Sequence, residues 1–592
     1  MAFFCASSSS LKPQNGFKDI QNTEKITYLI DDTCMQKAQG SSIAQDQAVN
    51  YFPTEDYNFL PEYHSSTDDF CVEYVQKLKK FKNILSKLVG DPFEGLNMVD
   101  AILRLGIEYH FQEEIEIILK RQYMIFSAHA GHDYDLYEAA LRFRLLRQDG
   151  YHVSAVNKLR LIVCHTDVFN KFKNKEGNFK LELIGHISGL MELYDASEVS
   201  INEEDILDEA KDFSRHLLEA NIKHLDHQQA KFILNTLRHP YHKSLPRFMA
   251  KDLPDNFKGA RSWVKHLQEL AKMDFKMVQS IHQQELLQIF KWWKGLGLAK
   301  KLNFARNQPL KWYMWTAACL TDPSLTYQRV ELTKPIAMVY VIDDLFDVYG
   351  TLDELTLFTN AVNRWELSAT EKLSDSLKIC FVALYDITNE ISYKVYKRTG
   401  WNPIDSLKKA WASLCNAFLL EAQWFASGNL PKAEEYMKNA HVSTGIHVVL
   451  VYMFFLLGEG ISKESVELLD SNPSITSSVA TILRLWDDLG NAQDEDQNGH
   501  DGSYIECYRK ERQGCSVEDA KIHVFKMISN AWKQLNKDCL IPNPFPASFI
   551  KASLNFARMV PLMYSYDEKH RLPGLEEHMK SLIFKSDPYK KM

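Results

Sequence analysis

The stretch Pro335-Ile-Ala-Met-Val-Tyr-Val-Ile-Asp-Asp-Leu-Phe-Asp347 joins the apolar residues Ile336 to Ile342 directly to three aspartates. On a helix, Asp343 and Asp347 are four residues apart and share one face. Carboxylates at the end of so apolar a helix are expected to be partly buried, where an unpaired charge is very costly. With no His or Cys nearby, Mg²⁺ is the cation that suits two such carboxylates. The alternative is a solvated helix end or an N-cap cluster that binds nothing.

Composition excludes several classes of partner and site. The chain has 592 residues, of which 45% are apolar and 25% charged, as in soluble globular proteins. The net charge is −8 and there is no Lys/Arg block, so nucleic acid is not an expected partner. The longest apolar run, Val448–Leu457, is too short to span a membrane and predicts a buried helix. The ten cysteines form no Cys-x-x-Cys pair, which argues against a zinc site or a disulfide framework.

The apolar residues follow the period of a helix over most of the chain. From about residue 67 onward they recur every 3.6 residues, as in Met98–Gly106 and Leu136–Arg147, and strand-like alternation is almost absent. Turn-rich segments near residues 238–256 indicate a domain boundary at about 255–275. The sequence therefore predicts an all-α protein with two helical domains, at 67–270 and 271–592.

The first 66 residues have a different composition. They are polar and turn-rich, and we expect a disordered leader. Residues 1–18 are rich in Ser and free of acids, as in organellar transit peptides, although they lack Arg and acids begin at Asp19. We expect the plastid stroma as the location, with the cytosol as the alternative.

A second oxygen-bearing stripe lies in the sequence Arg484-Leu-Trp-Asp-Asp-Leu-Gly-Asn-Ala-Gln-Asp-Glu495. Asp487, Asn491 and Glu495 are spaced i, i+4 and i+8, so they share one helical face and could hold another hard cation. Arg484 precedes Asp487 by three residues and could reach an anion bound to that cation. The alternative is a solvated acidic helix end.

The two stripes together predict a particular chemistry. Facing carboxylates could hold several Mg²⁺ ions, and such a cluster needs a multiply charged anion, such as a diphosphate. Trp312 and Trp315 lie on roughly one helical face and could line an aromatic cavity, although core packing is the commoner role of such residues. Metal ions stabilise a departing diphosphate as Lewis acids, and aromatic faces stabilise a carbocation. These features describe an enzyme that ionises an allylic diphosphate.

The same residues resemble those of the plant terpene synthases of class I, over about residues 67–592. Asp343-Asp-Leu-Phe-Asp-Val-Tyr-Gly-Thr351 is similar to the family's aspartate-rich metal motif, and Arg484–Glu495 to its second metal motif, with Asn491 where Ser or Thr is usual. The resemblance implies an N-terminal non-catalytic, α-barrel-like domain and a C-terminal catalytic helical bundle. It also implies three Mg²⁺ ions, for which Mn²⁺ could substitute, and a monomer.

The resemblance also implies roles for individual residues. The metal ligands would be Asp343, Asp347, Asp487, Asn491 and Glu495. Arg306 matches the first arginine of an Arg-x-Arg pair that binds diphosphate, and Arg484 and the aspartates Asp343, Asp347 and Asp487 complete the diphosphate site. Trp315 matches an aromatic residue of the cavity floor, and Tyr566 and Asp567 lie where family members close the cavity.

Departures from the family pattern bear on the product. Gln308 replaces the second arginine of Arg-x-Arg. The first arginine of the chain is Arg104, so the N-terminal tandem arginine of many cyclising members is absent, and no Asp-x-Asp-Asp occurs. The strings Ala305–Trp315 and Asn498–Ile505 resemble the linalool and nerolidol synthases. The resemblance implies water capture of the cation from geranyl or farnesyl diphosphate, giving linalool or nerolidol.

Three alternatives remain from the sequence. A terpene synthase of this kind could release a hydrocarbon such as myrcene, ocimene or a small cyclic product. A prenyl-chain elongase would carry a second Asp-Asp-x-x-Asp, whereas the second motif here reads Asp-Asp-Leu-Gly-Asn. A helical scaffold protein with solvated acidic helix ends would bind neither Mg²⁺ nor diphosphate.

Overall fold

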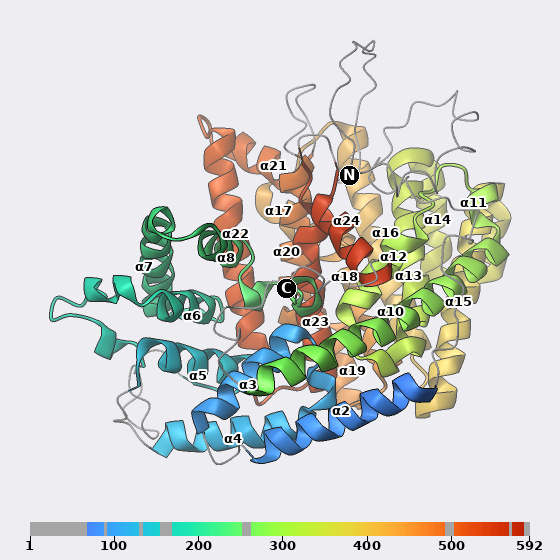
Figure 1. Cartoon of the computed structure of the whole chain (residues 1–592). Helices are drawn as coiled ribbons and strands as arrows, with labels where there is room; N and C mark the ends of the chain where they lie inside the picture. The colour runs from blue at the N-terminus through green and yellow to red at the C-terminus, as the bar shows by residue number, and fades with distance from the viewer. Residues whose placement is uncertain are drawn as a thin grey trace, which may run out of the picture. The chain divides into compact units, whose positions relative to one another are not determined.

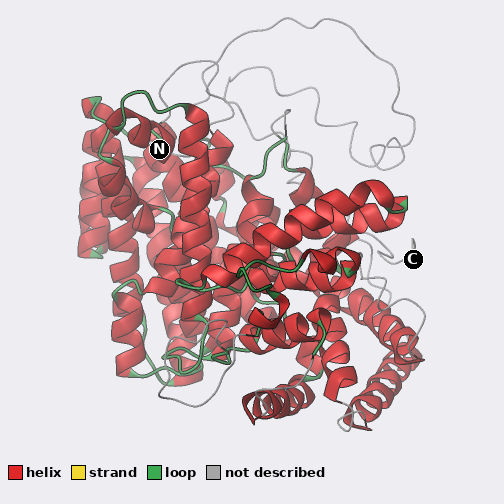
Figure 2. Ribbon diagram, turned by 90° about the vertical axis from the view of Figure 1, so that its left-hand side faces the viewer, coloured by secondary structure: helices red, strands yellow, loops and turns green. Residues whose placement is uncertain are grey.

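The computed structural model describes residues 68–87, 92–128, 134–153, 168–250, 262–491, 502–567 and 571–584. These residues form helices joined by loops and contain no β-strand (Figure 2), with one isolated antiparallel bridge between Lys173 and Phe179. The all-α prediction is confirmed. The predicted leader, residues 1–66, lies outside the described residues.

The chain divides into two compact units. The first in sequence comprises Tyr63–Ser280 and Ser529–Phe545, and the second comprises Ile281–Ile528 and Pro546–Phe584. The division falls within the continuous helix α10 (Ser262–Leu296), as does the predicted boundary at residue 270. Nothing in the sequence indicated that residues 529–545 return to the N-terminal unit. They do so through contacts such as the hydrogen bond from Asn536 Nδ2 to the carbonyl of Ser200, at 2.8 Å.

The N-terminal unit is a set of amphipathic helices around one apolar core (Figure 1). Its helices are α2 (Asp68–Lys87), α3 (Pro92–Leu105), α4 (Gln112–Ala128), α5 (Leu136–Gln148), α6 (Ile187–Ser197), α7 (Asp205–Asn221), α8 (His227–Arg238), α9 (Pro246–Met249) and the first part of α10. The end of α22 (Val517–Asp538) also belongs to this unit.

The C-terminal unit is a bundle whose central helices carry the predicted site. Helix α13 (Thr326–Asp344) packs against α12 (Pro309–Cys319), α15 (Asp375–Thr399) and α18 (Ile446–Leu457), and α20 (Ser474–Asn491) packs against α17 (Ala433–Ser443), α18 and α23 (Ala547–Tyr564). The remaining helices are α11 (Leu298–Lys301), α14 (Leu352–Arg364), α16 (Ile404–Ser427), α19 (Lys463–Asp470), α21 (Tyr504–Glu511) and α24 (Pro573–Met579). Pro335 lies inside α13 rather than at its start.

The apolar run Val448–Leu457 is a buried core helix, as the sequence predicts. Every residue of α18 from Ile446 to Leu456 is buried. The stretch Ala433–Leu457 is the one candidate in the described part of the chain that is long and apolar enough to cross a membrane. However, 83% of its most apolar part is buried inside the protein, as in a soluble core.

Candidate active site

The first aspartate cluster lies where α13 gives way to a π-helical turn, Leu345–Tyr349. Asp343 and Asp344 are buried, whereas Asp347 in the wider π-turn is half-buried. The sequence predicted a regular α-helix here, and local π-helical turns of this kind are frequent at functional sites. The two predicted ligands remain close to each other. Burial, reinforced by the neighbouring carboxylate of Asp347, raises the pKa of Asp343 to about 8.

Arg306 binds this cluster. Its guanidinium forms ion pairs with Asp343 and with Asp344, the latter with Nε 2.7 Å from Oδ1. Its backbone N–H also donates to Asp344 Oδ2 at 2.7 Å. The guanidinium lies over the ring of Tyr340, 4.9 Å from the centroid. An anion bound at the two aspartates through a cation would therefore meet a guanidinium held beside them.

The second cluster is at the end of α20. Arg484 and Asp487 are buried there, and Arg484 Nη1 lies 3.6 Å from Asp487 Oδ2. Arg484 Nη2 donates to Ser443 Oγ at 3.1 Å. Burial raises the pKa of Asp487 well above its usual range, and the carboxylate of Asp343 contributes to this rise. The structure thus brings the two predicted stripes close enough to repel each other.

The donor set fits a divalent cation. Asp487 Oδ2 is buried and has no hydrogen-bond partner among the described residues, and Asp343 is buried beside two further carboxylates, so added positive charge would relieve an energetic cost. Carboxylate oxygens without nitrogen or sulfur ligands suit Mg²⁺. Asn491 is the last residue of α20, and its side chain and Glu495 lie outside the described part. Among the described residues, no three His, Cys, Asp or Glu side chains form a complete metal site.

Asp488, which follows Asp487, has a role that sequence reasoning missed. It accepts hydrogen bonds from the Tyr436 hydroxyl at 2.9 Å and from the backbone N–H of Tyr504 at 3.0 Å. Asp488 therefore connects the end of α20 to α17 and α21 by hydrogen bonds. The sequence offered no signal for this difference, because both aspartates follow the same apolar turn.

A cavity between α12, α13, α18, α20 and α23 lies beside Asp343. Its aromatic lining comprises Trp315, Tyr340, Phe418, Phe556 and Tyr564, and its other lining residues are Ile336, Val339, Asp343, Ser443, Thr444, Ile446, Val449 and Leu483. Trp315 stacks on Phe556 with the ring centroids 4.5 Å apart, and its indole N–H donates to the Tyr340 hydroxyl at 3.0 Å. The sequence indicated Trp315. Phe418, Phe556 and Tyr564 carried no signal that separates them from ordinary core residues.

Tyr566 lies near the end of α20, and neither Tyr566 nor Asp567 is among the residues that line the cavity. The ring of Tyr566 packs so closely on Gly490 that a Cβ there would meet its Cδ2 at 3.1 Å. The Asp567 carboxylate is bound by Arg571, whose Nη2 is 2.8 Å from Oδ2. Their part in catalysis stays a prediction.

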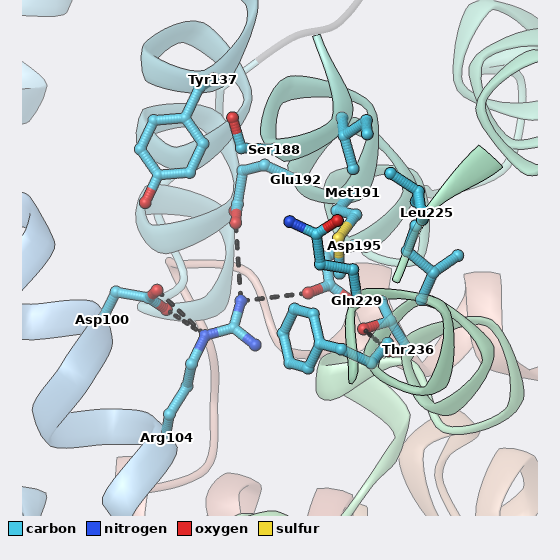
Figure 3. A pocket seen from close by; sticks show the side chains of 13 residues that line it. Asp100, Arg104, Tyr137, Ser188, Met191, Glu192, Asp195, Leu225, Gln229 and Thr236 are labelled. Carbon is cyan, nitrogen blue, oxygen red and sulfur yellow. Dashed lines mark hydrogen bonds and ion pairs between the residues drawn. The ribbon is translucent and has the colours of Figure 1, made fainter. Parts of the chain in front are cut away.

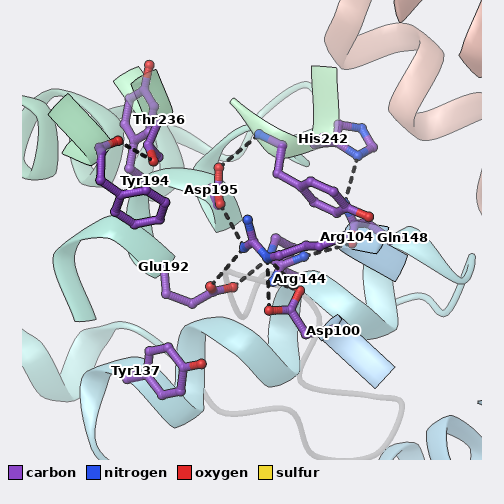
Figure 4. A network of polar contacts seen from close by, with 12 residues as sticks. Asp100, Arg104, Tyr137, Arg144, Gln148, Glu192, Tyr194, Asp195, Thr236 and His242 are labelled. Carbon is purple, nitrogen blue, oxygen red and sulfur yellow. Dashed lines mark hydrogen bonds and ion pairs between the residues drawn. The ribbon is translucent and has the colours of Figure 1, made fainter. Parts of the chain in front are cut away.

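The N-terminal unit holds a separate cavity of about 190 Å³ (Figure 3). At its floor, Arg104 forms ion pairs with Asp100 and Asp195, both at 3.0 Å (Figures 3 and 4). Arg144 adds ion pairs to Asp100 at 2.7 Å and to Glu192 at 2.5 Å. Three carboxylates thus share two guanidinium groups. This excess of negative charge opposes the binding of a diphosphate, so the cavity of the C-terminal unit is the better candidate for such a ligand.

Comparison with known proteins agrees with this geometry. The model of the "Terpene synthase family, metal binding domain" matches residues 294–534, and that of the "Terpene synthase, N-terminal domain" matches residues 51–238. A probable terpene synthase 4 from Ricinus communis is 56% identical, over 88% of this chain and 91% of its own length. An (E)-nerolidol synthase from Cannabis sativa is 52% identical, over 86% and 91%. A chloroplastic S-(+)-linalool synthase from Arabidopsis thaliana is 48% identical, over 88% and 90%.

A solved structure of the same architecture includes metal ions. Isoprene synthase from grey poplar leaves, in complex with three Mg²⁺ ions and dimethylallyl-S-thiolodiphosphate, aligns with a TM-score of 0.79 and 32% identity. The alignment covers 90% of this chain and 99% of that one. The fold is therefore that of a class I terpenoid synthase bundle preceded by a second helical domain. The chain belongs to the terpene synthase family of plants and is most like its linalool and nerolidol synthases.

Proposed function

We propose that this terpene synthase ionises geranyl or farnesyl diphosphate with the help of Mg²⁺ and captures the cation with water. The products would be the acyclic tertiary alcohols linalool and nerolidol. The observation that carries the proposal is the convergence of two buried aspartate clusters, each with its own arginine, beside an aromatic cavity. The relatives named for nerolidol and linalool synthesis support the choice of product.

The metal and diphosphate site would be shared by both clusters. Asp343, Asp347, Asp487, Asn491 and Glu495 would hold the ions, and we propose three Mg²⁺, with Mn²⁺ able to substitute. The bound ions would supply Lewis-acid stabilisation of the charge that develops on the departing diphosphate.

Arginine side chains and aromatic rings of the chain would stabilise the diphosphate and the allylic cation that ionisation produces. The guanidinium groups of Arg306 and Arg484 would each donate charge-assisted hydrogen bonds to diphosphate oxygens. The faces of Trp315 and Phe556 would stabilise the allylic cation by about 0.5–2 kcal/mol per contact. The apolar walls limit the access of water before the cation forms.

Water capture completes the reaction. The carbon–oxygen bond to diphosphate breaks with its electron pair staying on the diphosphate. A water oxygen then bonds to the tertiary allylic carbon, and the released proton passes to a diphosphate oxygen. Myrcene or ocimene would arise if the cation lost a proton instead, and a small cyclic hydrocarbon would arise if an alkene of the chain closed a ring on the cation before the proton was lost.

The available prenyl diphosphate depends on the compartment. We propose the plastid stroma, where the chain would meet geranyl diphosphate, with support from the chloroplastic linalool synthase among its relatives. A fluorescent fusion of residues 1–66 that fails to enter plastids would instead favour the cytosol and farnesyl diphosphate.

The function is tested by product analysis. The purified protein is incubated with Mg²⁺ and either geranyl or farnesyl diphosphate, and the volatiles are identified by chiral gas chromatography with mass spectrometry. The expected products are linalool and nerolidol, respectively. Mostly cyclic products would contradict the proposed outcome, and no product from either substrate would contradict the proposed activity.

A further inference from the structure

The first turn of α12 contains two buried side chains that each have one polar atom without a hydrogen-bond partner in the described part of the chain. Gln308, the N-cap of α12, is 6% exposed, and its Oε1 is buried without a hydrogen bond. The indole N–H of Trp312, four residues later, is also buried without a partner, and this side chain is 0% exposed. An acceptor and a donor are therefore left unsatisfied within about one helical turn.

Neighbouring polar groups on the same segment do find partners. Trp293 Nε1 donates to Asn307 Oδ1 at 2.7 Å, and Trp315 Nε1 donates to Tyr340 Oη at 3.0 Å. Most buried polar groups in proteins are hydrogen-bonded to protein or to ordered water, and an unsatisfied one costs about 1–3 kcal/mol. The two exceptions on α12 therefore indicate a polar ligand.

The two groups adjoin the site through their neighbours, although neither side chain is among those that line the cavity. Gln308 is two residues beyond Arg306, whose guanidinium contacts Asp343. The ring of Trp312 lies 6.4 Å from that of Tyr340, which lines the cavity and lies under the guanidinium of Arg306. A small ligand held by both groups would therefore adjoin a residue of the cavity wall.

We propose that Gln308 and Trp312 bind a single water molecule and that this water is the nucleophile which captures the cation. The inference rests on the proposed alcohol-forming function. The water accepts a hydrogen bond from the Trp312 N–H and donates one to Gln308 Oε1, which leaves a lone pair for the tertiary carbon. As the carbon–oxygen bond forms, the excess proton leaves for an oxygen of the diphosphate.

The residue type at position 308 matters for this role. A carboxamide carries an acceptor oxygen as well as donor hydrogens, whereas a guanidinium carries only donors. An arginine at this position could bind diphosphate but could not accept a hydrogen bond from water. Gln308 therefore converts an anion-binding position into one that can hold and orient a water molecule.

Three variants test the proposal in the full-length protein. Gln308→Met and Trp312→Phe each remove one hydrogen-bonding group while keeping an apolar side chain of similar shape. Trp411→Phe is the matched control, because it removes a buried indole N–H that already has a partner in Tyr452 and that is not part of the cavity lining. The ratio of alcohol to hydrocarbon products is measured with Mg²⁺ and geranyl or farnesyl diphosphate, in water enriched in ¹⁸O. Circular dichroism checks that each variant is folded.

We expect each test variant to lower the alcohol-to-hydrocarbon ratio by roughly two- to tenfold, the effect of losing one hydrogen bond. KM should be unchanged, and Trp411→Phe should leave the ratio unchanged. The wild-type alcohol should carry ¹⁸O, and a wild type that makes no alcohol would overturn the proposed function itself. If the wild type makes labelled alcohol but neither test variant changes the ratio, the function stands and the water site is refuted. A raised KM for Gln308→Met with an unchanged ratio would assign Gln308 to diphosphate binding instead.

Discussion

Asp487 and Asp488 are adjacent on α20, but their carboxylates differ in their hydrogen bonding. Replacing each with asparagine should therefore separate a role in catalysis from a role in stability. Asp488 accepts hydrogen bonds from Tyr436 and from the backbone of Tyr504. Asp487 Oδ2 accepts no hydrogen bond from the described part of the chain and lies 3.6 Å from Arg484 Nη1. We expect Asp488→Asn to destabilise the protein and Asp487→Asn to abolish most of the activity while leaving the fold intact.

The magnitudes follow from these contacts. An asparagine at 488 keeps one acceptor oxygen and loses the other, so one hydrogen bond to a charged group is lost, at about 1.5–3 kcal/mol. At 487 no short hydrogen bond is lost, so we expect the free energy of unfolding to change by about 1 kcal/mol or less. Loss of a metal-binding carboxylate removes several kcal/mol of transition-state stabilisation, and kcat/KM should fall by roughly 10²- to 10³-fold.

Two measurements on each variant decide between the roles. Urea unfolding followed by circular dichroism gives stability, and steady-state kinetics with Mg²⁺ and geranyl diphosphate give kcat/KM. Asp488→Asn, assayed where it is fully folded, should keep kcat/KM within about tenfold of the wild type. The assignment is refuted if Asp487→Asn is as destabilised as Asp488→Asn and retains wild-type kcat/KM.

Further predictions concern three other parts of the C-terminal unit. Burial opposes ionisation of Glu285, but hydrogen bonds from Arg329 at 2.7 and 2.8 Å outweigh it and lower the pKa from 4.5 to about 2. Because the folded-state pKa is depressed, this stabilisation is present above pH 4.5, and about 3 kcal/mol should be lost as the pH falls to 2. Glu285→Gln should remove this loss of stability at low pH, as measured by urea unfolding. An unchanged dependence of the free energy of unfolding on pH would contradict the prediction. Arg484→Lys keeps the charge but loses the planar fork, so KM for geranyl diphosphate should rise by roughly tenfold in steady-state assays. Trp315→Leu should lower kcat by roughly two- to thirtyfold with KM unchanged, whereas Trp315→Phe should lower it less, and the reverse order would exclude a cation-stabilising ring.

The helical fold could be predicted from the sequence because periodicity and burial coincide. The run from Ile336 to Ile342 is apolar on every face, and the structure buries it in the centre of the bundle as part of α13. Local sequence did not indicate the π-turn at Leu345–Tyr349, because propensities hardly distinguish a π-turn from the α-helix that it continues. The return of residues 529–545 to the N-terminal unit depends on long-range contacts, such as that of Asn536 with Ser200.

The charged part of the site was easier to predict than the apolar part. Asp343, Asp487 and Arg484 stand out because charged residues next to apolar helical turns are unusual. Arg306 was identified by the resemblance to the family's Arg-x-Arg pair, and the structure brings all four together. The walls of the cavity did not stand out, since an aromatic residue such as Phe556 looks the same in sequence whether it faces a substrate or another helix.

The most direct test of the account is the Mg²⁺ dependence of diphosphate release from geranyl or farnesyl diphosphate. Purified wild-type protein and Asp343→Asn are compared with Mg²⁺ and with a chelator, after circular dichroism has shown that both are folded. We expect the wild type to release diphosphate with Mg²⁺ but not with the chelator. The rate of release by Asp343→Asn with Mg²⁺ should be at least roughly 10²-fold lower. Equal release with and without Mg²⁺, or full activity of Asp343→Asn, would contradict the account.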